Sequence, residues 1–90
     1  MKINVTQADI DKANKLNNSE KGRVAATHDC PICFSLKRSK QAPDPVVHFK
    51  IAWLDSMSAK GVELPKKAET AQKQWVKTGK MEPFSFELGE

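Results

Sequence analysis

The sequence predicts an α+β fold: a small, mostly antiparallel sheet with helices packed on one face, in the order β-α-α-β-β-α-β. Three patterns lead to this prediction. Apolar and polar side chains alternate near both ends of the chain, and a β-branched and aromatic run occupies the middle. Helical spacing follows a capping residue or a proline in three places. Ninety residues suffice for one core, so residues 1–90 are expected to form a single domain.

The first expected element is a short strand at Ile3–Val5, where apolar and polar side chains alternate. Thr6 follows as an N-cap, and Asp9 stands three residues further along, which resembles a capping box at the start of a helix. We expect this helix to end at about Lys15 or Leu16, before a cluster of turn-forming residues.

A second helix should begin near Asp29, which can cap it, with Pro31 in a first turn where the missing N–H has no intrahelical partner. Its apolar face is Ile32, Cys33 and Leu36, and its C-terminal cations are Lys37, Arg38 and Lys40. Two polar stretches flank this helix and are expected to be mobile, Asn17–Arg23 before it and Ser39–Pro45 after it. Pro43 and Pro45 favour an extended exit.

The middle of the chain predicts a hairpin. Val46–Leu54 is β-branched and aromatic and is interpreted as one strand. Residues Asp55–Gly61 carry turn-forming side chains, and Val62–Leu64 is expected to be the returning strand.

The clearest helix is expected from Pro65 to Gly79, a natural C-terminal stop. Its apolar face comprises Ala68, Ala71, Gln72, Trp75 and Val76. The opposite face gathers Lys66, Lys73 and Lys77. The chain then reaches Pro83–Leu88, whose strict alternation predicts a half-buried final strand with Phe84, Phe86 and Leu88 on one side.

Composition excludes several function classes. The formal charge is +4, yet 13 of the 15 basic residues are lysine, whereas reading of base edges favours arginine. No apolar run approaches the length of a membrane span, and Met1–Val5 lacks the apolar region of a signal peptide. We therefore expect an intracellular protein without a membrane partner, whose two cysteines are reduced.

No hydrolytic triad, phosphate loop or carboxylate pair is recognisable, so a non-enzymatic role is expected.

The sharpest local motif is His28-Asp29-Cys30-Pro31-Ile32-Cys33, with His48 downstream. His28, Cys30, Cys33 and His48 are all the histidines and cysteines of the chain, and thiolates with imidazoles are the ligands that zinc prefers. A structural zinc site is one interpretation. The favoured interpretation is that no cofactor binds and that both cysteines are small apolar residues packing a helix.

Cys-Pro-x-Cys also resembles the active-site motif of glutaredoxin-like enzymes. A thiol at a helix N-terminus has a lowered pKa, so Cys30 would be the nucleophile and Cys33 the resolving thiol. Such enzymes place a cis-proline loop opposite the thiols. Pro65 is the nearest candidate for that proline, but its position favours a helix start, which weakens this hypothesis.

The basic face of Lys66, Lys73 and Lys77 is a candidate site for a partner or a polyanion. A lysine stripe opposite an apolar face is also what a solvated helix presents. No stacking set accompanies the stripe, because Trp75 is expected on the other face and the chain has no tyrosine. Trp53 and Trp75 could anchor an interface, but core packing is favoured for both.

Several stretches, taken in order, resemble a family of very small proteins encoded by tailed bacteriophages. They are Val5-Thr6-Gln7-Ala8-Asp9-Ile10-Asp11, Cys30-Pro31-Ile32-Cys33-Phe34-Ser35-Leu36, Leu64-Pro65 with Ala68 and Ala71, Gly79, and Pro83-Phe84-Ser85-Phe86-Glu87-Leu88. Members usually have a small apolar residue where Cys33 stands, so the resemblance assigns the cysteine pair no shared role. The family has no established activity.

The resemblance implies a phage accessory protein of the host-takeover class, acting in the host cytoplasm. We expect it to bind a host protein and to inhibit or redirect it, with anti-CRISPR-like inhibition as one version. The alternatives are a weak, non-specific nucleic-acid binder that uses the Lys66, Lys73 and Lys77 face, and a small zinc-stabilised module.

Overall fold

The computed structural model describes residues 2–39, 42, 44–48, 50–55 and 61–88. In chain order the elements are β1 (Lys2–Val5), α1 (Gln7–Leu16), α2 (Glu20–Val24), α3 (Pro31–Arg38), β2 (Val46–His48), β3 (Ile51–Trp53), β4 (Val62–Glu63), α4 (Lys66–Thr78) and β5 (Phe84–Glu87). The α+β class predicted from the sequence is confirmed. The described residues contain one helix and one strand more than the predicted order.

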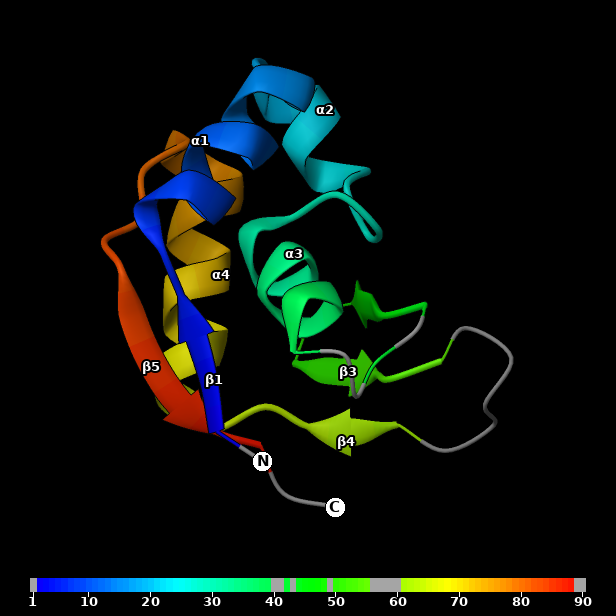
Figure 1. The fold of residues 1–90 in the computed structure, drawn as a ribbon. Coiled ribbons are helices and arrows are strands. Elements are labelled where there is room, and N and C mark those ends of the chain that lie inside the picture. The colour runs from blue at the N-terminus through cyan, green and yellow to red at the C-terminus, as the bar shows by residue number, and fades with distance from the viewer. Residues whose placement is uncertain (1, 40–41, 43, 49, 56–60, 89–90) are drawn as a thin grey trace.

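The strands divide between two antiparallel sheets. β1 pairs with β5, so that Ile3 lies opposite Phe86. In the second sheet β3 is central, with β2 on one side and β4 on the other. Figure 1 shows α3 in the middle of the molecule, between β1 and the three-stranded sheet. Each sheet therefore covers a different side of one buried helix.

The predicted single strand Val46–Leu54 is two strands, β2 and β3, that pair with His48 opposite Ile51. Lys50 is the only charged residue within this run, and it lies exposed between the two strands. A turn at this point keeps the Lys50 ammonium group in water while Val47 and Ala52 are buried in the core. Phe49 lies outside the described residues.

The helix α2 falls in the stretch that we expected to be a mobile connection. Ser19 caps it, because its Oγ accepts a hydrogen bond from the backbone N–H of Gly22 at 3.1 Å. None of its residues is buried, so the apolar periodicity that normally marks a helix is absent from the sequence. A hydrogen bond joins α2 to α4, because Arg23 Nε donates to the carbonyl of Val76 at 3.1 Å.

The predicted ends of α1 and α4 are confirmed. Thr6 and Asp9 form a complete capping box at the start of α1. Gly79 ends α4 in the left-handed conformation, with φ of 77°, which only glycine adopts without strain. Trp75 is fully buried on α4 and donates from Nε1 to Asn14 Oδ1 on α1 at 2.8 Å. Trp53, expected in the core, is half-buried.

Some predictions fall on residues that the structure does not describe. The link Ser39–Pro45 includes residues 40, 41 and 43, and the turn Asp55–Gly61 includes residues 56–60. Among the helices in the described ranges, none has the length and apolar character needed to cross a lipid bilayer.

Asp9 joins three elements, which generates a test of the fold. Its Oδ2 accepts from the Thr6 backbone N–H at 2.9 Å and from Arg38 Nη2 at 2.7 Å, while Arg38 also donates to the carbonyl of Asn4. We predict that Asp9→Ala lowers the free energy of unfolding by about 1–2 kcal/mol, because the cap and a charge-assisted hydrogen bond are both lost.

Urea denaturation measures this change, and Asp11→Ala on the same helix is the matched control. Asp11 is exposed, and among the described residues it accepts only from the Gln7 side chain in the same helix. Equal losses in the two variants would contradict the bridging role of Asp9.

Candidate functional site

The N-cap of helix α3 is one residue later than the cap that we expected at Asp29. Its N-cap is Cys30, whose Sγ accepts a hydrogen bond from the backbone N–H of Cys33 at 3.3 Å. Asp29, which we expected to be the cap, is only half-buried, and its carbonyl accepts from Asn17 Nδ2 at 3.0 Å. A sulfur caps this end because the cap position is fully buried, where a carboxylate would lose its hydration.

The two thiols form a continuous hydrogen-bonded chain. Both are fully buried, and their Sγ atoms lie 3.1 Å apart, with the Cys30 thiol donating to Cys33. The Cys33 thiol donates in turn to the carbonyl of Thr27 at 2.9 Å. Both cysteines are core residues, as the packing interpretation expected, and these contacts show that they also interact as polar groups.

The pKa values of the two thiols move apart. Burial raises the pKa of Cys30, but hydrogen bonds with the Cys33 side chain and backbone, with Gln72 and with the Ile32 backbone outweigh burial and hold that pKa below its ordinary value. The pKa of Cys33 is raised strongly, because its side chain is hydrogen-bonded to Cys30, because it is buried, and because a Cys30 thiolate repels a second charge. The pair therefore loses its first proton from Cys30.

Gln72 of α4 links this pair to a cavity. Its side-chain amide donates to Cys30, yet its Oε1 is buried without a hydrogen-bond partner among the described residues. Gln72 is 7% exposed and lines a cavity of about 320 Å³. Thr27, the acceptor for Cys33, lines the same cavity. Two residues of the cavity lining, Thr27 and Gln72, are thus hydrogen-bond partners of the thiols.

The cavity lies between α2, β2 and α4. Its described lining residues are Arg23, Val24, Ala26, Thr27, Val47, His48, Gln72, Lys73 and Val76. Two of them carry a positive charge and none carries a carboxylate. Val24 is 64% exposed and is one of two large hydrophobic residues, with Leu16, that the described surface leaves open. The cavity therefore has apolar walls and a basic rim, which suits an anionic group attached to an apolar body.

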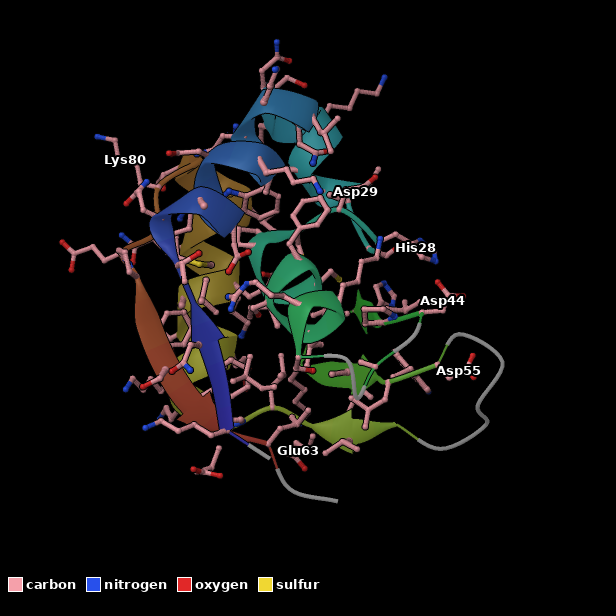
Figure 2. All side chains as sticks on the ribbon, in the orientation of Figure 1. His28, Asp29, Asp44, Asp55, Glu63 and Lys80 are labelled. Carbon is pink, nitrogen blue, oxygen red and sulfur yellow. The ribbon has the colours of Figure 1, made fainter. Side chains whose placement is uncertain are left out.

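The four candidate zinc ligands do not come together. Cys30 and Cys33 point into the core, whereas His28 and His48 are exposed. Figure 2 shows His28 at the periphery, on the segment that leads into α3, where its Nδ1 lies 3.3 Å from Thr27 Oγ1. Throughout the described ranges, no group of three or more His, Cys, Asp or Glu side chains is placed to hold a metal ion. The spacing in sequence does not become a cluster in space.

The predicted basic face is present on α4. Lys66, Lys73 and Lys77 are all exposed. Lys73 also pairs with Glu69 at 3.1 Å and reaches the cavity rim, so it is the residue that joins the two features. On the other side of α4, a second cavity of about 650 Å³ lies against β5, and there Lys67 Nζ stands 5.8 Å from the ring centre of Phe84.

Sequence reasoning identified the cysteines but missed the cavity and the part played by Gln72. One signal was available, because Gln72 is the only polar residue on the predicted apolar face of α4. A buried amide among apolar neighbours requires a polar partner. Its partner, Cys30, lies 42 positions earlier, and no periodic pattern reports such a contact.

Comparisons with protein-family models, with curated proteins and with solved structures give no match to this chain. The candidate site is therefore interpreted from its own geometry.

The separated pKa values give a direct test by thiolate absorbance. We predict that the reduced protein forms one thiolate below the ordinary cysteine pKa of about 8.5, and that the second thiol stays protonated well above it. Gln72→Met should raise the midpoint of the first step, because a donor to the thiolate is lost. Gln74→Met, an exposed change on the same helix, is the control. Two thiols that titrate together at the ordinary value would contradict this arrangement.

The same shifts predict how stability depends on pH. The pKa of Cys30 is lower in the folded than in the unfolded protein, so stability rises as pH increases between those two values. The pKa of Cys33 is higher in the folded protein, so stability falls as pH passes the ordinary cysteine value. Urea denaturation across this range should therefore show a maximum that is absent from Cys30→Ala/Cys33→Ala, and a flat profile in the wild type would contradict it.

Proposed function

We propose that this chain is a non-enzymatic, bacteriophage-type accessory protein that binds a host protein in the host cytoplasm and inhibits or redirects it. Two observations support the proposal. The ordered motifs of the sequence resemble small phage proteins, and the basic cavity with exposed Val24 offers a surface for a partner. The cavity is the observation that carries the proposal, because it combines shape, apolar walls and one sign of charge.

The chemistry of the cavity indicates what the partner presents. Arg23 and Lys73 at the rim attract carboxylates, while Val24, Val47 and Val76 line the walls. An acidic segment with one apolar side chain would place its anchor among the valines and its carboxylates near the rim. The net charge of +4 adds long-range attraction to such a segment.

A nucleic-acid partner fits this surface less well. Lys66, Lys73 and Lys77 would contact phosphates, but no aromatic side chain on this face of α4 accompanies them in the sequence. Trp75 is fully buried and cannot stack on a base. Non-specific binding through these lysines is the second candidate, and their common exposure on α4 is the observation that favours it.

The binding proposal predicts a residue-specific loss of capture from host lysate. Immobilised wild type should retain a host protein that Val24→Asp loses, with binding weakened about ten-fold or more, because a carboxylate then stands at the cavity mouth beside the incoming acidic segment. Leu16→Asp is the matched control, since Leu16 is 58% exposed and is not among the cavity-lining residues. Sequencing of the captured protein should locate the acidic segment that competes for binding as a peptide.

Equal capture by wild type and Val24→Asp would contradict the proposed surface. The nucleic-acid candidate predicts a different pattern. Binding to single-stranded DNA would fall steeply as salt is raised and would weaken in Lys66→Ala/Lys77→Ala, whereas Val24→Asp would change it little.

A further inference from the structure

We propose that Cys30 and Cys33 form a reversible redox centre that reduces a low-molecular-weight disulfide bearing carboxylates, which reaches the thiols through the basic cavity. Three observations carry this inference. The two sulfurs are adjacent at the start of α3, two residues of the cavity wall (Thr27 and Gln72) are their hydrogen-bond partners, and Gln72 Oε1 is buried without a partner among the described residues.

The sulfurs are already placed for bond formation. They lie 3.1 Å apart, so a movement of about 1 Å brings them to disulfide distance. Cys30 stands at the N-cap, where the positive end of the helix dipole favours a thiolate and the Cys33 backbone N–H donates to it. Cys33 is one helical turn further on and keeps its proton until the mixed disulfide has formed on Cys30. Cys30 is thus placed as the nucleophile and Cys33 as the resolving thiol.

Access to Cys30 depends on Gln72. Both sulfurs are fully buried, so a reactant must displace part of the wall. The side chain of Gln72 is the part of the wall that is least firmly held, because its buried Oε1 makes no hydrogen bond with any described group. Rotation of this side chain toward the cavity gives up its contact with Cys30 but allows Oε1 to gain a partner, which offsets the loss.

The cavity indicates the class of reactant. Its volume of about 320 Å³ lies within the range of small-molecule sites. Arg23 and Lys73 favour carboxylates, and Thr27 and Gln72, the partners of the thiols, line the same cavity. One half of a short peptide-like disulfide with several carboxylates has the required size and charge, whereas a folded protein disulfide is too large for the cavity.

The exchange proceeds in two steps. The Cys30 thiolate attacks one sulfur of the disulfide R–S–S–R, which forms a Cys30–S–S–R bond and releases RS⁻. The sulfur of Cys33 then attacks Cys30, which forms the Cys30–Cys33 disulfide, and its proton leaves with the second RS⁻. The protein loses two electrons and two protons in total, counting the proton that Cys30 gave up on ionisation, and the products are two molecules of RSH.

Thiol exchange at Cys30 does not require a host protein. A chain that captures no partner can still exchange with a small disulfide, and a redox-inert chain can still bind a partner through Val24. The two sets of experiments therefore fail separately.

The test uses the full chain in buffers containing reduced and oxidised glutathione at set ratios, followed by quenching with an alkylating reagent and mass spectrometry. The wild type should lose two hydrogens as the fraction of oxidised glutathione rises and recover them when the ratio is reversed. A dithiol that persists at every ratio, or that oxidises only in denaturant, would overturn the proposal.

Single variants assign the roles. Cys33→Ala should accumulate a glutathione adduct on Cys30, because nothing remains to resolve the mixed disulfide. Cys30→Ala should form at least ten-fold less adduct on Cys33, which lies inside α3 rather than at its N-cap and is fully buried. Circular dichroism confirms that each variant is folded. Equal adducts in the two folded variants would overturn the assignment of Cys30 as nucleophile.

The route through the cavity has its own control. Lys73→Ala should slow oxidation by glutathione disulfide about two- to five-fold, the effect of one partly exposed charge, without slowing oxidation by neutral hydroxyethyl disulfide. Lys2→Ala removes an exposed lysine from β1, outside the cavity lining, and should leave both rates unchanged. A Lys73→Ala rate equal to wild type for the charged disulfide would overturn the basic-cavity route.

Discussion

Complete burial of the first six residues of α3 constrains much of this structure. Pro31–Leu36 lie in the core on every side of the helix, whereas an ordinary surface helix buries one stripe. Water cannot reach the free backbone groups at the start of such a helix, so they need partners inside the protein. Pro31 removes one donor, and the sulfur of Cys30 accepts another from Cys33. Ser35 satisfies its own hydroxyl by donating to the carbonyl of Ile32 at 2.6 Å.

The same constraint explains the chemistry of the cysteines. A carboxylate cap would be costly in so dry a position, whereas a thiol can be buried neutral and still accept a backbone N–H. The two thiols at this end of the helix are hydrogen-bonded to each other. The pKa of Cys30 is therefore lowered and the pKa of Cys33 is raised. The Gln72 side chain on α4 contacts Cys30 with one end of its amide, while its Oε1 has no hydrogen-bond partner among the described residues. Within the described part of the chain, packing around α3 thus leaves this polar atom unsatisfied at the wall of the cavity.

The two proposals use different lining residues of this cavity. Arg23, Val24 and Lys73 carry the proposed binding of an acidic host segment, and Thr27 and Gln72 are hydrogen-bond partners of the thiols. Arg23 lines the cavity and also joins α2 to α4 through its hydrogen bond to Val76. The helix α2 therefore has a structural role although none of its residues is buried. Surface binding and thiol exchange therefore use different atoms of one feature.

The sequence by itself determined the elements whose signals are local. The capping box of Thr6 and Asp9, the stop at Gly79 and the alternation in β5 depend on neighbouring residues, and the structure contains each of them. Tertiary packing decided the rest. It placed Cys30 rather than Asp29 at the cap, turned the run around Lys50 into a hairpin, and kept His28 and His48 away from the thiols. Gln72 and Cys30 meet because α3 and α4 pack together, and contacts between distant residues leave no periodic trace in a single sequence.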